Sequence, residues 1–211
     1  MAVPDPALAA REAASVRKLR PEDREAAIAA VAHAFYDDPV FSFLLPNDGR
    51  RARQLQGLFG VLARRVWIPH DESFTTDSVV SAAFWVPPGE WHVSLLEQVR
   101  MAPATIARVG LRDQPALLRA LALIEKKHPR DPHHYLPAIG VAPEWQGKGI
   151  GTALLRPMLE RCDREGTPAY LEASSERNRA CYERNGFEVR EELRIPGGGP
   201  PLWPMWRKPQ P

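Results

Sequence analysis

The stretch Tyr135 to Asp163 reads YLPAIGVAPEWQGKGIGTALLRPMLERCD, and the rest of the chain can be placed around it. An apolar run from Leu136 to Val141 ends at Pro143, and a turn with three glycines follows. Apolar residues then recur at the spacing of one helix face. The stretch therefore predicts a strand, a glycine-rich turn and a helix. The glycines are Gly147, Gly149 and Gly151, and the helical apolar positions are Leu154, Leu155, Met158, Leu159 and Cys162.

The predicted turn is suited to phosphate. The first N–H groups of a helix have no internal partner and lie at the positive end of its dipole. Glycines let the backbone approach an anion closely. The spacing excludes the dinucleotide fingerprint G-x-G-x-x-G, and a Walker loop is excluded because Lys148 is followed by Gly149. The remaining pattern is Q-x-x-G-x-G from Gln146, which is by itself also compatible with an ordinary strand-to-helix turn.

A second informative segment, Pro168 to Val189, reads PAYLEASSERNRACYERNGFEV. It predicts a strand over 169–173, a helix over 177–184 capped by Ser174 or Ser175, and a further strand opening at Phe187. Asn178 and Tyr182 are four residues apart, so they share one face of the predicted helix.

Together the two segments resemble the GNAT superfamily of N-acetyltransferases, and most of all its puromycin N-acetyltransferase-like members. The motifs that carry this resemblance lie between Tyr135 and Lys208, whereas the N-terminal half matches in layout alone. The resemblance implies an α/β fold with a mixed, mostly antiparallel sheet of six to seven strands flanked by helices. The two strands that precede the glycine-turn helix and the Asn178 helix should run parallel and splay apart.

The resemblance also implies acetyl-CoA as the cofactor and assigns catalytic roles. The backbone N–H of Val141 would stabilise the oxygen that becomes negative during transfer, and Tyr182 would protonate the departing thiolate. Direct transfer in a ternary complex is expected, because neither Cys162 nor Cys181 has an adjacent histidine base. The implied cofactor-binding residues are Ile139, Val141, Gln146, Gly147, Lys148, Gly149, Ile150, Gly151, Thr152, Asn178 and Tyr182.

The general base is open. Several relatives place a Glu or His six residues before the position of Val141, and here Tyr135 occupies it. Glu172 on the neighbouring strand is the first candidate. His133, which should share a strand face with Tyr135 while His134 points the other way, is the second. The alternative readings are a surface position for the histidines, a structural role for Glu172, and an acceptor amine that arrives already deprotonated.

The N-terminal half predicts a strand near 15–19, a helix from Pro21 to about Tyr36, a helix over 51–67, and a strand pair over 74–85. In the family layout the loop from Tyr36 to Pro39 borders the acceptor pocket, where carboxylates could attract a cationic amine. Their alternative reading is as solvated loop acids, one of which caps the next helix. The candidate substrate residues are Tyr36, Asp38, Trp85, His133 and Tyr135.

Domain organisation follows from this layout. We expect a flexible N-terminal arm over 1–14 and one domain over 15–211, with a helical insertion at about 89–132. The insertion is a candidate lid over the acceptor side. Its alternative role is packing against the sheet or a second subunit.

Composition narrows the function classes. The 211 residues carry a formal net charge of +2 and no basic block, so nucleic-acid binding is not indicated. No apolar run reaches the length of a membrane span, residues 1–10 lack a signal-peptide pattern, and two cysteines support neither a disulfide framework nor a metal site. We expect a cytoplasmic monomer or homodimer.

The sequence thus predicts an acetyl-CoA-dependent N-acetyltransferase that acts on a primary amine of a small molecule, such as an aminonucleoside or another antibiotic-like amine. Two alternatives remain: an acetyltransferase for protein N-termini or lysines, and a non-catalytic acyl-CoA-binding module. The insertion favours a small amine.

Overall fold

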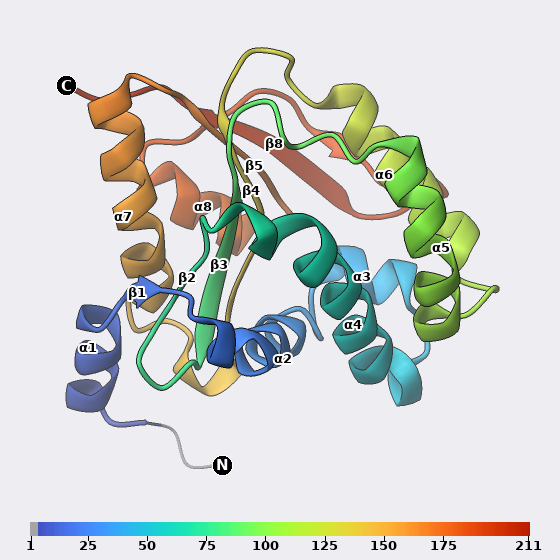
Figure 1. The fold of residues 1–211 in the computed structure, drawn as a ribbon, viewed down its shortest axis with the longest axis horizontal. Helices are drawn as coiled ribbons and strands as arrows, with labels where there is room; N and C mark the ends of the chain where they lie inside the picture. Colours follow the sequence, from blue (N-terminus) through green and yellow to red (C-terminus); the bar gives the residue numbers. More distant parts are fainter. Residues whose placement is uncertain (1–3) are drawn as a thin grey trace.

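A computed structural model describes residues 4–211 and contains one eight-stranded sheet (Figure 1). The strand order is β1-β2-β3-β4-β5-β8-β6, with β7 paired to β8. β4 and β5 run parallel, and all the other pairs are antiparallel. The predicted mixed sheet is confirmed, with an additional strand in the short β7. The strands are β1 Arg17–Lys18, β2 Phe74–Thr75, β3 Ser81–Val86, β4 His134–Val141, β5 Ala169–Ala173, β6 Glu188–Val189, β7 Leu193–Arg194 and β8 Pro201–Arg207.

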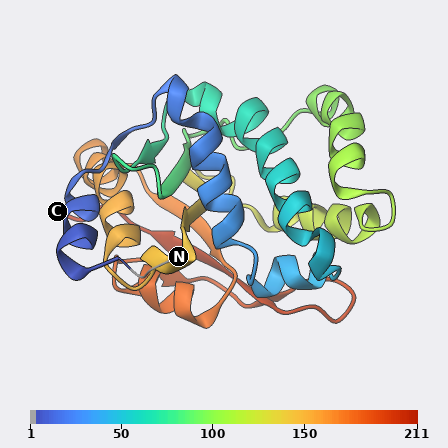
Figure 2. The same cartoon turned by 90° about the horizontal axis from the view of Figure 1, so that it is seen from below.

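Helices cover both faces of the sheet. Figure 1 shows α1 and α7 beside one face, and Figure 2 shows α2, α4 and the insertion helices side by side over the other. Short single-turn helices lie at 21–23, 68–70 and 143–145, and a π-turn at 63–67 extends α4. The α-helices are α1 Pro6–Ala14, α2 Arg24–Ala34, α3 Pro39–Leu44, α4 Asp48–Leu62, α5 Leu95–Val109, α6 Gln114–Lys127, α7 Ile150–Glu165 and α8 Glu176–Glu183.

Each face has its own apolar core. The α2 face buries side chains of α2, α4, β3 and β4, among them Ile28, Phe59, Phe84 and Ala138. Gly140 on β4 permits the close approach of α2, because a Cβ at that position would lie 2.8 Å from the Val31 Cα. The α7 face buries apolar side chains of α7 together with the alternate residues of the same strands. The members on this face include Trp85, Leu136, Leu154, Met158 and Leu171.

The N-terminal segment differs from the predicted flexible arm. Residues 1–3 lie outside the described part, but from Pro6 the chain forms α1, which Asp5 caps through a 2.7 Å bond from the Leu8 N–H. Ala9 is buried, and α1 contacts α7. The prediction of a flexible arm is wrong for residues 6–14, because the apolar residues of this segment are mostly alanines, whose small side chains gave no sign of a docking surface.

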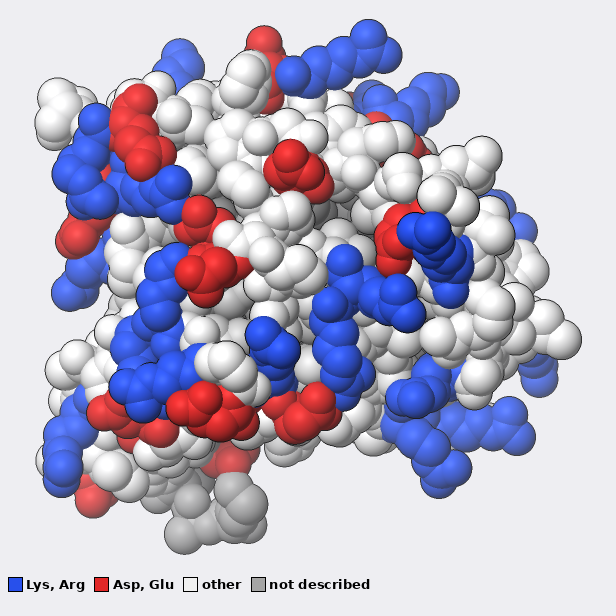
Figure 3. Space-filling model, viewed as in Figure 1, with Lys and Arg blue, Asp and Glu red and all other residues white. Residues whose placement is uncertain are grey.

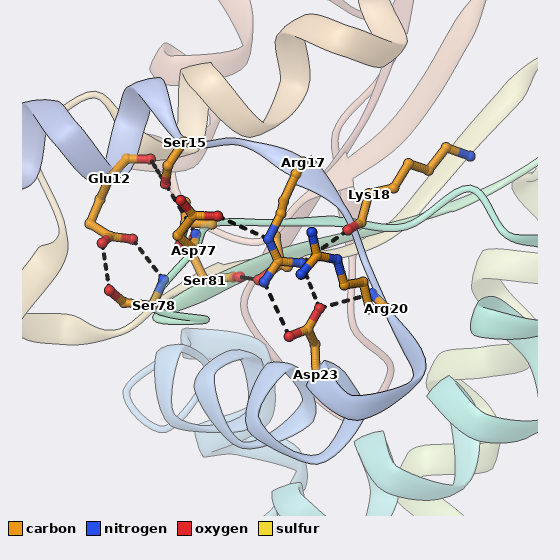
Figure 4. A network of polar contacts seen from close by, with 11 residues as sticks. Glu12, Ser15, Arg17, Lys18, Arg20, Asp23, Asp77, Ser78 and Ser81 are labelled. Carbon is orange, nitrogen blue, oxygen red and sulfur yellow. Dashed lines mark hydrogen bonds and ion pairs between the residues drawn. The ribbon is translucent and has the colours of Figure 1, made fainter.

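A polar network fixes α1 to the strands (Figure 4). The buried Glu12 carboxylate accepts a hydrogen bond of 2.6 Å from the Ser78 hydroxyl, in the β2–β3 turn. Arg17 on β1 donates to Asp23 at 2.6 Å and to Asp77 at 3.0 Å. The β2–β3 turn therefore joins α1, β1 and the start of α2.

The insertion is helical, as predicted, and consists of α5 and α6. α5 contacts α4, so the insertion extends the α2 face away from the sheet centre (Figure 2). Charged side chains of both signs are interspersed on the face drawn in Figure 3. Within residues 4–211, no helix has both the length and the hydropathy needed to cross a membrane.

Candidate functional site

The site is built where β4 and β5 separate. The two strands pair from His134 to Leu136 on β4 and from Ala169 to Leu171 on β5, and no further pairing follows although both strands continue. Pro137 comes directly after the last paired residue of β4 and has no N–H with which to bond a neighbour. The predicted parallel, splayed pair is confirmed.

The backbone N–H groups of Ile139 and Val141 point towards this gap. The Ala142 N–H donates to the Val80 carbonyl of the β3 side at 2.9 Å, and successive residues of an antiparallel strand alternate in direction. Val141 and Ile139 therefore direct their polar backbone groups away from β3. Two predicted cofactor-side donors thus border the separation of the strands.

The glycine turn leaves an accessible helix N-terminus. Gly147 and Gly149 have φ angles of 75° and 82°, a region that favours glycine, and Gly149 precedes the first residue of α7. A Cβ at Gly149 would meet no atom within 4 Å. The first helical N–H bond is from Ala153 to the Gly149 carbonyl, so the amides of Ile150, Gly151 and Thr152 lie in the free first turn.

Gln146 ties this turn to the strand end. Its amide nitrogen donates to the Val141 carbonyl at 3.0 Å, and its amide oxygen accepts from Arg177 of α8 at 3.3 Å. Lys148 is half-buried at the rim of the turn. The glutamine therefore positions the turn relative to β4 and α8, a role that the sequence pattern did not specify.

α8 brings Asn178 and Tyr182 to the same region. The helix is capped by Ser175, whose hydroxyl accepts from the Asn178 N–H at 3.2 Å, which confirms one of the two predicted caps. The Tyr182 ring lies in the α7-face core, 6.0 Å from the Phe187 ring. Burial raises the pKa of Tyr182 well above its ordinary value, so its hydroxyl keeps its proton at neutral pH.

Glu172 is the first β5 residue beyond the last pair with β4. Its side chain is 8 % exposed and accepts a 2.9 Å hydrogen bond from the Tyr135 hydroxyl at Oε2. Burial raises the pKa of Glu172 to about 7. Oε1 has no hydrogen-bond partner among the described residues. A carboxyl group that titrates near neutral pH can both accept and return a proton.

The two histidines at the start of β4, His133 and His134, occupy opposite faces, as predicted. His133 lies with Tyr135 and Tyr170, whereas His134 faces Glu165 of α7 at 3.5 Å. Both are 1 % exposed, so the alternative reading of a surface pair is wrong. Burial lowers the pKa of each. His133 does not reach the Glu172 carboxylate directly but contacts His128. The sequence pattern did not indicate His128 as a site residue, because it directly follows α6 of the insertion.

Asp38 connects the α2–α3 loop to the end of β5. One carboxylate oxygen caps α3 through the N–H groups of Val40 and Phe41, at 2.9 and 3.2 Å, and the other accepts from the Ser174 hydroxyl. Burial raises the pKa of Asp38. The reading as a solvated acid is thus wrong, whereas the helix-cap reading is correct. Tyr36, half-buried, donates to the Asp48 carbonyl at 3.3 Å and faces α4 instead.

Trp85 requires a correction. It is fully buried in the α7-face core, among the apolar side chains of α7, whereas Tyr135 packs against the α2-face core. The prediction that Trp85 contacts the acceptor is wrong, because its position on β3 points its side chain into the packed layer beneath α7.

Within residues 4–211, no three His, Cys, Asp or Glu side chains are placed to hold a metal ion.

Comparison with known proteins agrees with this geometry. Residues 76–187 match the family model "Acetyltransferase (GNAT) family". An uncharacterised N-acetyltransferase of Schizosaccharomyces pombe is 27% identical over 191 residues, which cover 85% of this chain and 76% of that protein.

Two solved structures share the fold. The structure described as histone acetyltransferase HPA2 and related acetyltransferase, from Corynebacterium glutamicum, has a TM-score of 0.71 and 24% identity and covers 93% of this chain and 97% of its own. A putative arylalkylamine N-acetyltransferase 7 from the yellow fever mosquito has a TM-score of 0.65 and 15% identity and covers 92% and 86%. With the family model matched across the strand separation, the glycine turn and Tyr182, this chain belongs to the GNAT family of acetyltransferases.

Proposed function

We propose that this chain transfers the acetyl group of acetyl-CoA directly to a primary amine of a small molecule. The observation that carries the proposal is the separation of β4 from β5, which is bordered by the glycine turn, Tyr182 and Glu172. These features combine an anion-binding helix end, a protonated acid and a group that titrates near neutral pH.

The donor side fits acetyl-CoA, which GNAT enzymes generally use. The free first turn of α7 offers N–H groups to the pyrophosphate, and the space above Gly149 leaves room for it. Lys148 adds positive charge at the rim, and Asn178 on α8 is the candidate contact for the pantetheine arm. The cofactor supplies an acetyl group activated as a thioester.

Different residues have different roles in the proposed reaction. The N–H groups of Ile139 and Val141, which point away from β3, would stabilise negative charge on the acetyl oxygen. Tyr182 holds a proton at its hydroxyl for the departing sulfur, since burial keeps it neutral. Glu172 accepts a proton from the amine, and the hydrogen bond from Tyr135 orients the carboxyl group.

Support for a small amine comes from the acceptor side. The buried Asp38 carboxylate adds negative charge near Tyr182, and α5 and α6 extend the molecule beside this face. A protein of similar fold is described as a putative arylalkylamine N-acetyltransferase. We therefore favour a small amine over a protein N-terminus or lysine.

Calorimetric titration with acetyl-CoA tests the donor side, with Gly149→Trp as the variant and Gly166→Trp as the matched control. Both glycines have positive φ angles, and at both a Cβ would meet no atom within 4 Å, but Gly166 lies at the opposite end of α7. We expect binding by the wild type and the control and its loss in Gly149→Trp. No binding by the wild type would remove the basis for acetyl transfer.

An acceptor panel tests the substrate class. It contains an arylalkylamine, a polyamine, puromycin as an aminonucleoside, and a peptide with a free N-terminus and a lysine. Acetylation of one of the small amines at much higher kcat/KM than the peptide supports the proposal. Preference for the peptide would replace it with the protein-acetylating alternative, and binding without turnover of any amine would favour an acyl-CoA-binding module.

A further inference from the structure

A pair of buried histidines lies behind Glu172. His128, directly after α6, has Nδ1 at 3.8 Å from the Glu172 Oε1 atom and Nε2 at 3.0 Å from the His133 Nε2 atom. His133 Nδ1 lies 2.6 Å from the Asp131 carbonyl oxygen. The result is a continuous line of polar atoms from the candidate base to the loop that joins the insertion to β4.

The Asp131 carbonyl at the end of this series of contacts determines which ring nitrogen of each histidine carries the proton. A carbonyl oxygen only accepts, so His133 must carry its proton on Nδ1, and its neutral ring then offers a lone pair at Nε2. The contact between the two rings therefore requires the proton of His128 on Nε2. His128 consequently presents a lone pair at Nδ1, towards Glu172.

Neighbouring rings hold His128 in this orientation. Trp91 stacks on it with ring centroids 3.8 Å apart, and Tyr135 and Tyr170 meet it edge-on at 4.7 and 4.8 Å. Burial lowers the pKa of His128 to about 3 and also lowers that of His133, so both rings are neutral at physiological pH. The lone pair is thus a fixed feature of the site rather than one of two tautomers.

A lone pair that faces a carboxylate is unfavourable, whereas one that faces a carboxylic acid accepts a hydrogen bond. We propose that His128 is a positioning residue for Glu172: its Nδ1 accepts the hydrogen bond of the protonated carboxyl group, and the chain through His133 to the Asp131 carbonyl directs Nδ1 at Oε1. This inference rests on the proposed role of Glu172 as the base.

The proton balance is simple. When the amine loses its proton, the N–H bond breaks and an O–H bond forms on the Glu172 carboxyl group, whose Oε1 atom has no other partner among the described residues. A closure of the 3.8 Å contact to about 2.8 Å then makes the hydrogen bond to His128. The insertion therefore contributes to the site through His128, the residue directly after α6.

The other polar groups around the carboxyl group come from β4 and β5. Tyr135 on β4 donates to Oε2, and Tyr170 on β5 lies close enough to favour the ionised form. Arg190, after β6, stacks on Trp206 of β8, and its charge acts on His133. Of the groups near the carboxyl, His128 is the one that faces Oε1 with a lone pair.

Nitrogen-15 NMR of the histidine rings tests the proton assignment without any substrate. At pH 7 we expect His133 as the Nδ1–H tautomer and His128 as the Nε2–H tautomer, with the His128 ring not titrating between pH 5 and 8. A His128 ring protonated at Nδ1 would donate to the carboxylate and would overturn the proposal, even if variants of His128 fail to fold.

The pH dependence of kcat/KM gives the second test, with His128→Phe as the variant and His134→Phe as the control. Phenylalanine keeps the stack on Trp91 but lacks the lone pair, so the acidic limb should move to lower pH by about one unit. His134 is equally buried but lies on the α7 face, so its variant should keep the wild-type limb.

An unchanged limb in His128→Phe, together with an inactive Glu172→Gln, would overturn the role of His128 alone. A Glu172→Gln variant with wild-type activity would instead overturn the proposed base, and His128 would then have no catalytic group to position. The two failures are therefore distinguishable.

Discussion

The two sides of the strand separation are built in different ways. The proposed donor side comes from neighbouring segments, with the glycine turn, α7 and α8 all between residues 146 and 183, and it would bind through backbone N–H groups. The proposed acceptor side is assembled from distant segments, since Asp38 bonds to Ser174 and His128 faces Glu172, and it contains buried ionisable side chains.

Cofactor binding and proton transfer would therefore depend on different kinds of residue. A helix N-terminus binds phosphate through geometry that a short glycine pattern already encodes. A buried carboxyl group acquires its pKa from whichever side chains the fold places around it. Substitutions on the donor side should therefore change cofactor affinity, and substitutions on the acceptor side should change the rate and its pH dependence.

The largest effect is expected for Glu172→Gln. Loss of the base should lower kcat by about 10²- to 10⁴-fold while acetyl-CoA affinity stays unchanged. In the wild type, activity should fall as the pH drops below about 7, because the pKa of Glu172 is raised to about 7 and the protonated carboxyl cannot accept a proton. Steady-state kinetics from pH 5 to 9 measure both.

The same experiment can contradict this prediction. If the Gln variant keeps its rate at pH 8, the amine must arrive deprotonated and need no base. In that case the acceptor side would orient the substrate without taking part in proton transfer. The two sides would then differ only in what they bind, the cofactor or the amine.

A smaller loss of rate is expected for Tyr182→Phe, of the order of 10²-fold in kcat. The ring still packs against Phe187, so folding and acetyl-CoA affinity should be close to wild type. Burial raises the pKa of Tyr182, so the wild type should show no basic limb from this residue between pH 7 and 9. Kinetics and calorimetry separate the two parameters.

A wild-type rate in Tyr182→Phe would assign the proton to another donor, such as water. A large fall in acetyl-CoA affinity instead would place the hydroxyl in cofactor binding rather than in proton transfer.

The smallest effect is expected on stability. It is measured by comparing two helix caps of the same type. Asp38 and Asp5 each precede a proline and cap a helix, α3 and α1, but Asp38 is buried and also bonds Ser174, whereas Asp5 is exposed. Asp38→Ala should lower the free energy of unfolding by about 1–2 kcal/mol and Asp5→Ala by about 0.5–1 kcal/mol. Urea denaturation measures both, and equal losses would show that the Ser174 contact contributes nothing.

Local patterns predicted much of the molecule. The strand, glycine turn and helix over 135–163 are encoded by apolar runs and glycine spacing, and they form as expected because each depends on neighbouring residues. The same holds for the Ser175 cap, the Asn178–Tyr182 face and the helical insertion.

The faces of β4 show why pattern alone was insufficient. Strict alternation would place Tyr135 and Val141 on one face, but Trp85 of β3 lies opposite both Leu136 and Pro137 of β4. This β-bulge shifts the alternation, so Tyr135 packs on the α2 face and Val141 on the α7 face.

The GNAT fold, the glycine turn before α7 and the shared face of Asn178 and Tyr182 on α8 were predictable from the chain alone, because they follow from the order and spacing of nearby residues. Only the tertiary structure decided that Trp85 is core, that Asp38 is buried against Ser174, and that His128 lies behind Glu172. The physical reason is that burial and the resulting pKa values depend on segments that meet only after the sheet has formed.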